Sequence, residues 1–321
     1  MVDEHTQAAA AIEHVARRVR ENIGRVIVGR DEVVELVLVA LLADGHILIE
    51  DVPGIGKTML AKSIARSVGC SFKRIQFTPD LMPSDVTGIH YYNQKSGEFE
   101  FRPGPVIANI VLADEINRAT PRTQSALLEA MEERQLTIDG VTMPLPSPFL
   151  VLATQNPIEL EGTFPLPEAQ LDRFLMRVRV GYPTEAEEDD ILLRFEGESP
   201  LETLEPVVTA EELVRLRALV PRVRCEPSVR RYLTAIVRAT RRHPALELGA
   251  SPRASLALFR GARALAAIRG RDYVLPDDVK FLAPVVLAHR LILSSQTRLR
   301  GRDAAGVVEE VLEQVAAPVE G

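Results

Sequence analysis

The chain has 321 residues, of which 46% are hydrophobic and 26% are charged, and this composition excludes a disordered polymer. No apolar run reaches the roughly 18 residues that a membrane-spanning helix needs. The two cysteines, Cys70 and Cys225, lack the spacing of a zinc site, and the acidic start has no features of a secretory signal. We therefore expect a cytoplasmic protein with two buried thiols.

The net charge of −7 disfavours a dedicated nucleic-acid-binding protein, but this charge is unevenly distributed. Residues 213–271 contain fourteen arginines, no lysine and two acids, Glu226 and Glu247, so their net charge is +12 and the rest of the chain carries −19. Such a region could contact phosphates, nucleic acid or the acidic part of a neighbouring copy. The sequence does not choose among these partners.

Short apolar strands alternate with helical stretches up to about residue 183, which predicts a parallel α/β sheet. A helix is expected within the first twenty-odd residues, and five strands at 46–50, 72–77, 109–113, 149–153 and 175–180. A further helix is expected from Thr120-Pro121, residues that suit a cap and a first turn. Beyond residue 184 only helical periods occur, with helix starts at Ser251-Pro252 and at Pro276. We therefore predict an α/β domain over 1–183 and an all-helical domain over 184–321.

The first strand leads into a glycine-rich turn and a helix, with the sequence Asp51-Val52-Pro53-Gly54-Ile55-Gly56-Lys57-Thr58-Met59. A phosphate-binding loop needs glycines where side chains would block the phosphates, and a helix N-terminus directed at them. In such a loop Lys57 reaches the β- and γ-phosphates and the Thr58 hydroxyl holds Mg²⁺. The general pattern has a glycine at the position of Asp51, and an ordinary strand-to-helix turn is the much less favoured alternative.

The second half of the predicted site follows the third strand, which ends in Asp114-Glu115. A carboxylate at the end of a strand beside the loop can hold Mg²⁺, and a second carboxylate can activate the attacking water. We therefore assign Asp114 to the metal and Glu115 to general-base catalysis. Two acids at a surface strand end are common in isolation, but they are improbable as an accident beside a phosphate-binding loop.

Six segments together resemble the MoxR family of AAA+ ATPases and extend over nearly the whole chain. They are residues 50–58, 75–85, 112–119, 153–157, 167–174 and 251–254. The resemblance implies an α/β AAA+ P-loop NTPase core with a parallel five-stranded sheet, and a C-terminal helical lid domain. It implies ATP and Mg²⁺ as cofactors, with Thr58 and Asp114 on the metal. The implied nucleotide-binding residues are Val28, Gly29, Pro53, Gly54, Ile55, Gly56, Lys57, Thr58 and Met59.

Three further residues take their roles from the resemblance alone. Asn156 would orient the attacking water against the γ-phosphate, whereas by itself it is a polar turn residue after a strand. Arg173 would be the arginine finger presented to the ATP of the next subunit, whereas the sequence alone favours an ion pair with Asp172 or Glu168. Arg253, in the first turn of a lid helix, would close the lid on the phosphates.

Two insertions are predicted to be β-hairpins, at 85–105 and at 135–147. The first carries four aromatic residues, Tyr91, Tyr92, Phe99 and Phe101, and the second has the turn signal Asp139-Gly140. In related rings such hairpins face the pore and contact the substrate. Surface ribbons whose aromatic side chains are packed down fit the sequence equally well.

The resemblance implies a homo-hexamer that remodels, assembles or activates client proteins, together with a von Willebrand factor A domain adaptor. A nucleic-acid-associated motor that uses the basic lid region is the alternative, and the acidic total and low aromatic content disfavour it. An ATP-binding switch that barely hydrolyses is a third possibility, which the presence of Glu115, Asn156 and Arg173 disfavours.

Overall fold

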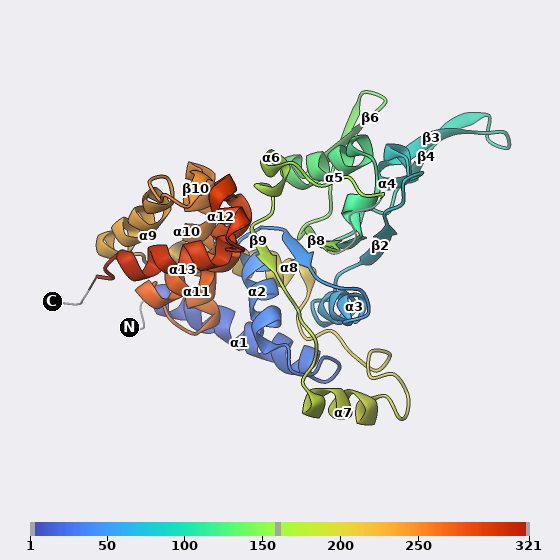
Figure 1. Ribbon diagram of the computed structural model, residues 1–321. Helices are drawn as coiled ribbons and strands as arrows, with labels where there is room; N and C mark the ends of the chain where they lie inside the picture. The colour runs from blue at the N-terminus through green and yellow to red at the C-terminus, as the bar shows by residue number, and fades with distance from the viewer. Residues whose placement is uncertain (1–3, 158–161, 319–321) are drawn as a thin grey trace.

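A parallel five-stranded sheet forms the centre of the structure, a computed structural model that describes residues 4–157 and 162–318 (Figure 1). Its strand order is β2-β5-β8-β1-β9. The strands are β1 (Ile47–Glu50), β2 (Phe72–Gln76), β5 (Ile110–Asp114), β8 (Leu150–Gln155) and β9 (Met176–Val178). All five lie within the predicted apolar runs or extend them by one or two residues. Because the strands are parallel, their C-terminal ends meet at one edge, where the segments after β1, β5 and β8 come together.

Alternating side chains of the strands divide the core of this part into two layers. Ile110 and Leu112 of β5 face the layer of α1 (Glu4–Gly24), α2 (Asp31–Leu42), α3 (Lys57–Ser67) and α8 (Ala210–Leu219). Val111 and Ala113 face the opposite layer, formed by α4 (Pro83–Thr87) and α5 (Pro121–Glu133). The sheet is therefore covered on both faces, which explains why the inner strands β1, β5 and β8 are continuous apolar runs.

A helical bundle lies beside the edge strand β9, at the left of Figure 1. Its helices are α9 (Pro227–Thr240), α10 (Pro252–Ile268), α11 (Pro276–Leu287), α12 (Ser295–Leu299) and α13 (Ala304–Gln314). Two of them tie the bundle to the sheet part, because α10 packs against α1 and α2, and α11 contacts β9. The described residues also contain three short 3₁₀ turns: η1 (Ile116–Arg118), η2 (Val220–Arg222) and η3 (Ala288–Arg290).

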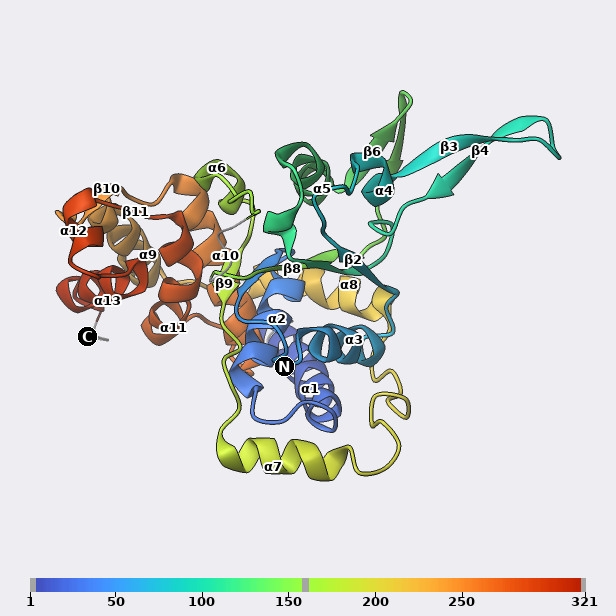
Figure 2. The ribbon, with the colours of Figure 1, turned by 45° about the vertical axis from the view of Figure 1, so that its right-hand side comes forward.

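The stretch after residue 184 is not all helical, contrary to the expectation. Strand β10 (Leu246–Leu248) pairs antiparallel with β11 (Ile292–Leu293), and strands of two or three residues are too short to produce a periodic pattern. The first helices of this stretch also lie outside the bundle. Helix α8 packs on α1 and α2, and α7 (Glu185–Arg194) lies at the lower edge of the molecule in both views (Figures 1 and 2).

Both predicted hairpins are present and project from the upper right of the molecule (Figure 2). They are β3 (Gly88–Asn93) with β4 (Glu98–Pro103), and β6 (Gln135–Ile138) with β7 (Val141–Pro144). Asp139 and Gly140 both have positive φ, 51° and 80°, as a tight two-residue turn requires. In the first hairpin Phe101 packs on His90, whereas Phe99 is 73% exposed and Tyr92 54% exposed. These two aromatic side chains are therefore not packed down.

No helix within residues 4–157 and 162–318 combines the length and the apolar character needed to cross a bilayer.

Candidate functional site

The loop between β1 and α3 has the geometry of an anion cradle. Gly54 and Gly56 both have φ of 88°, a conformation that strains any residue with a Cβ. No atom lies within 4 Å of the position that a Cβ would take at either glycine, so both open into free space. Gly56 is the N-cap of α3, which begins at Lys57. The N-terminus of α3 is therefore presented at this opening, where it favours a bound anion.

Asp51 joins this loop to the edge strand. Its Oδ2 accepts hydrogen bonds from the backbone N–H groups of Val180 (2.8 Å) and Gly181 (2.7 Å), and its Oδ1 accepts one from Val52 (2.9 Å). Asp51 does not have a positive φ, so its position does not require a glycine. The carboxylate of Asp51, which replaces the usual glycine, therefore connects the loop to the segment after β9.

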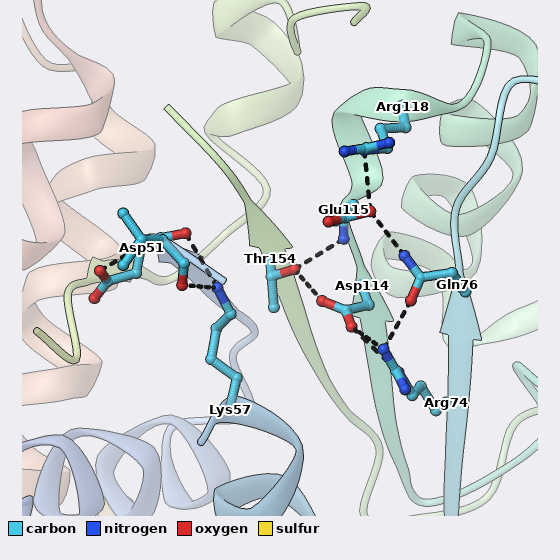
Figure 3. Close-up of polar contacts among 9 residues, drawn as sticks. Asp51, Lys57, Arg74, Gln76, Asp114, Glu115, Arg118 and Thr154 are labelled. Atoms are coloured by element: carbon cyan, nitrogen blue, oxygen red, sulfur yellow. Dashed lines mark hydrogen bonds and ion pairs between the residues drawn. The ribbon is translucent and has the colours of Figure 1, made fainter. Parts of the chain in front are cut away.

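Lys57 lies over the loop that precedes it. Its Nζ donates to the carbonyl oxygens of Asp51 (3.1 Å) and Val52 (2.9 Å), as Figure 3 shows. Burial lowers the pKa of Lys57 below its ordinary value, and the carboxylates of Asp114, Asp51 and Glu115 oppose that shift. Two carbonyl oxygens thus hold the ammonium group in the cavity, and a bound anion can accept a further hydrogen bond from it.

Asp114 and Glu115 lie at the end of β5 and are ordered by the neighbouring strand β8. Thr154 Oγ1 donates to Asp114 Oδ1 (2.6 Å) and accepts from the backbone N–H of Glu115 (2.8 Å). Glu115 has φ of 57°, a left-handed conformation that costs a residue with a side chain about 1 kcal/mol or more. Thr154 helps to hold this strained turn, which directs the two adjacent carboxylates to one site.

Two side chains of β2 contact the same pair of carboxylates (Figure 3). Arg74 donates to Asp114 Oδ2 from Nε (3.2 Å) and Nη2 (2.6 Å), and Gln76 Nε2 donates to Glu115 Oε2 (2.8 Å). Arg118 Nε pairs with the same Glu115 oxygen at 3.0 Å. These contacts offset the repulsion between two neighbouring carboxylates and fix where each one points.

Most of the predicted catalytic residues line one polar cavity of about 250 Å³. Its lining includes Lys57, Thr58, Asp114, Glu115 and Asn156. Asn156 directly follows β8, so the residues after β1, β5 and β8 meet at one edge of the sheet, as the strand order requires. The fold therefore brings these five predicted residues together, and four predicted loop residues, Pro53, Gly54, Gly56 and Met59, line the same cavity.

A second cavity, of about 400 Å³, adjoins the first and shares Pro53, Gly54, Gly56 and Met59 with it. Ile55 also lines this cavity. Its other walls are mostly apolar and come from the segment after α1, from α3, from the segment after β9 and from α7 with its C-cap: Val26, Ile27, Val28, Leu60, Val180, Ile191, Leu192 and Phe195. Val28 thus lies in this cavity, whereas Gly29 lines a neighbouring cavity with Arg177 and Arg179. An apolar cavity beside a polar one suits a ligand with a flat base at one end and phosphates at the other.

Arg173 and Arg253 lie elsewhere and share one acid. Arg173 Nε pairs with Glu132 Oε2 at 3.1 Å, and Arg253 Nη2 pairs with Glu132 Oε1. Neither arginine lines the two cavities described above. The partner expected for Arg173 within its own chain was wrong, because Asp172 pairs instead with the buried Arg290, at 2.6 Å.

The cavity residues fit a magnesium nucleotide. Thr58 and Asp114 supply the oxygen ligands that Mg²⁺ prefers, and the loop glycines leave space for phosphate oxygens. Asp114 Oδ1 accepts one hydrogen bond, from Thr154, and a carboxylate oxygen can accept a second one from a metal-bound water. Lys57 supplies the compensating positive charge.

Sequence reasoning missed Arg74, Gln76, Thr154 and the part of the base cavity that α7 contributes. Arg74 and Gln76 are exposed residues of the edge strand β2, where a polar side chain gives no sign of a functional role. Gln76 lies opposite Asp114 and Arg74 opposite Leu112, and each side chain bonds an acid one or two residues further along the chain, Glu115 and Asp114 respectively. The pairing of β2 with β5 is a property of the sheet order and is not visible in the sequence.

Comparisons with known proteins agree with this geometry. Residues 46–176 match the ATPase family associated with various cellular activities (AAA), and residues 238–319 match the AAA lid domain. The chain is 53% identical to the uncharacterized protein YeaC of Bacillus subtilis, over 99% of this chain and 97% of that protein. It is 46% identical to Chaperone MoxR1 of Mycobacterium tuberculosis, over 97% and 85%. A crystal structure of an ATPase candidate from Cytophaga hutchinsonii has a TM-score of 0.91 at 39% identity and covers 98% of both chains.

Proposed function

Because the chain belongs to the MoxR family of AAA+ ATPases, we propose that it hydrolyses MgATP in a homo-hexameric ring and uses the cycle to remodel, assemble or activate client protein complexes. A relative that is 46% identical is named a chaperone, which supports this class of activity. A separate protein with a von Willebrand factor A domain is the proposed adaptor between ring and client.

The two adjoining cavities supply a group for each requirement of hydrolysis. The base lies in the apolar cavity, and Lys57 with the loop N–H groups binds the β- and γ-phosphates. Thr58 and Asp114 would hold Mg²⁺, which would neutralise charge on the phosphate oxygens. Glu115 accepts the proton of the attacking water, and Asn156 orients that water. Gln76 and Arg118 hold Glu115 in place for this step.

The observation that carries the proposal of a ring is the position of Arg173. It follows α6 (Glu168–Leu171), and its neighbour Asp172 is fixed by Arg290, which also donates to the carbonyl oxygens of Phe174 and Leu175. Arg173 is therefore held on a rigid segment, outside the cavity of its own chain. A guanidinium on such a segment suits a phosphate site on a neighbouring subunit, where it can raise the rate by roughly 10³–10⁵.

Glu132 holds Arg253 beside Arg173, so both arginines are available to the phosphate site of a neighbouring subunit. A hydrogen bond from Arg253 and the nearby charge of Arg173 lower the pKa of Glu132, so the carboxylate stays ionised and keeps both guanidinium groups together. We place both arginines on the neighbour's γ-phosphate, with Glu132 as the positioning residue between them. Arg253 would then sense the nucleotide of the next subunit and not that of its own chain.

The test is the ATPase rate per subunit as a function of protein concentration, with the oligomer mass recorded in parallel. The wild-type rate should rise as hexamers form. Glu115→Gln should bind ATP and assemble but turn over at least about 100-fold more slowly. Arg173→Ala should bind ATP and stay slow at every concentration.

Mixing the two inactive variants distinguishes a site completed by a neighbour from one completed within the subunit. An Arg173→Ala subunit keeps Glu115, and an adjacent Glu115→Gln subunit can lend it an arginine. Mixed rings should therefore recover a measurable part of the wild-type rate. A rate independent of concentration in a monomeric protein, together with no recovery on mixing, would contradict the proposal.

A further inference from the structure

A groove lined by arginines lies on the outer side of the bundle, far from the nucleotide cavities. It has a volume of about 630 Å³ and runs along one face of α9 to the C-terminal end of α13. Along α9 its lining is spaced by three and four residues: Arg231, Thr234, Ala235, Arg238 and Ala239. Arg230 of the same helix, Arg242, His243 and Pro244 after it, and Gln314 of α13 complete the lining. Alanines therefore form the floor of this groove and guanidinium groups form its walls.

These arginines differ from most others in the basic region, residues 213–271, because their guanidinium groups form no ion pairs with acids in the described part of the same chain. Arg217, Arg222 and Arg269 pair with Asp44, Glu4 and Glu35. In residues 4–157 and 162–318, by contrast, the guanidinium groups of Arg230, Arg231, Arg238 and Arg242 have no hydrogen bond or ion pair. All four are exposed. Four like charges around one concave surface are a favourable site for an acidic partner.

Helix α7 carries the complementary surface. Ala186, Asp189, Asp190 and Leu193 are spaced as i, i+3, i+4 and i+7, so they share one face of α7. None of the four is among the residues that line the nucleotide cavities. Asp189 and Asp190 are exposed and have no ion pair within the described residues, and Leu193 is 57% exposed. Two acids beside an apolar side chain match guanidinium groups beside an alanine floor.

The two surfaces cannot meet within one molecule, because α7 lies at the lower edge and α9 at the left in both views (Figures 1 and 2). We infer that the arginine groove of one subunit binds the acidic outer face of α7 of the next subunit. Such a contact joins two different surfaces and repeats head to tail, which is the kind that closes into rings. The inference rests on the proposed ring and adds its charge-complementary contact.

This contact would also couple assembly to nucleotide. The opposite face of α7 supplies Glu188, Ile191 and Leu192 to the base cavity, so one helix contacts both the bound base and the neighbouring subunit. A nucleotide that orders α7 would present Asp189 and Asp190 in a fixed position. Assembly should therefore strengthen with nucleotide and weaken with salt.

The experiment exchanges the charges of the two surfaces. The groove variant is Arg231→Glu with Arg238→Glu, and the helix variant is Asp189→Arg with Asp190→Arg. The control for the groove variant is Arg260→Glu with Arg298→Glu. These two exposed arginines lie outside the groove, and their replacement changes the net charge by the same amount as the groove variant does. Oligomer mass is measured against protein concentration in a non-hydrolysable ATP analogue at low and high salt.

Each single-surface variant should raise the concentration for half-assembly about tenfold or more, and the control should not. The variant carrying both reversals should recover most of the loss, because the opposite charges face each other again. Assembly of the groove variant at the wild-type concentration, or no recovery in the combined variant, overturns the inference. If the groove variant assembles normally but loses binding to a labelled single-stranded oligonucleotide, nucleic acid is the occupant and the inference is wrong.

The two proposals fail in different ways. If the wild type assembles and the combined variant does not recover, only this contact is refuted, and the mixing test with Arg173→Ala still decides the ring mechanism. A wild-type protein that stays monomeric at every concentration with nucleotide refutes both.

Discussion

At the scale of single residues, Asp51 shows how a loop can depart from a sequence pattern and keep its geometry. Phosphate-binding loops usually have a glycine where this chain has Asp51, whose carboxylate accepts three backbone N–H groups. Two of them belong to Val180 and Gly181, just after the edge strand β9. A glycine could accept none of these bonds through a side chain. In this chain the Asp51 side chain therefore anchors the phosphate-binding loop to the segment after β9.

We predict that Asp51→Gly lowers the free energy of unfolding by about 2 kcal/mol, since hydrogen bonds to a charged group contribute roughly 1.5–3 kcal/mol. The loop should also bind nucleotide more weakly, because β9 no longer holds it. Urea denaturation and titration with a fluorescent ATP analogue measure the two effects. Asp51→Asn is the control, because its amide oxygen keeps an acceptor and the loss should be smaller. A glycine variant as stable as the wild type would contradict this role.

At the scale of elements, the hairpin of β3 and β4 is built to expose its aromatic residues. Phe99 and Tyr92 lie opposite each other with ring centroids 5.4 Å apart, and both are mostly solvent-exposed. Glu100 secures the turn by accepting hydrogen bonds from Tyr91, Asn93 and Ser96, which lower its pKa. A hairpin ordered by polar bonds can present apolar side chains to a client without relying on them for stability.

We therefore predict that Phe99→Ala changes the free energy of unfolding by less than about 0.5 kcal/mol, as is usual for an exposed position. Phe77→Ala, at a fully buried position in the same part of the chain, should cost about 3–5 kcal/mol. Chemical denaturation of both variants makes the comparison. A loss above about 2 kcal/mol for Phe99→Ala would mean that this aromatic ring is packed, and the client-contact interpretation of the hairpin would fail.

The elements also show which features a sequence can predict. The strands β1, β5 and β8 could be found because buried parallel strands are unbroken apolar runs, and the second hairpin because Asp139-Gly140 is a turn signal. The strands β10 and β11 are too short to leave a pattern. The partner of Arg173 could not be found, because it depends on Arg290 occupying Asp172 and leaving Glu132 of α5 as the nearest acid. Contacts of this kind are properties of the packed chain and not of neighbouring residues.

At the scale of the whole molecule, the uneven charge serves partly to join the two parts. The pairs Arg217–Asp44, Arg222–Glu4 and Arg269–Glu35 each connect the basic region with the acidic N-terminal part. Arg253 and Glu132 add a fourth such pair at the proposed subunit contact. Four of the fourteen arginines in residues 213–271 are thus paired with acids of the N-terminal part, and the arginines of the groove are available to a partner.

Buried histidines give the molecule a pH dependence whose sign can be worked out. Burial lowers the pKa of His46 and of His289 well below the ordinary value, and Arg134 and Arg290 respectively lower it further. His46 Nε2 donates to the carbonyl of Met131 and Nδ1 accepts from the N–H of Val151, so a second proton would have no acceptor. Both histidines are therefore neutral in the folded state at a pH where they are protonated in the unfolded chain.

The unfolded chain thus binds more protons below about pH 6.5, and the free energy of unfolding should fall as the pH decreases from 6.5 to 5. The limiting slope is about 1.4 kcal/mol per pH unit for each histidine. Carboxylates with lowered pKa, such as Glu132, add to the loss only at lower pH, so this window isolates the histidines. Urea denaturation at pH 7, 6 and 5 measures the slope, and His289→Gln should reduce it by about half, because one of the two titrating groups is gone. A free energy of unfolding that stays constant across this window would show that the histidines take up protons in the folded state, and that His46 is not tightly packed between α5 and β8.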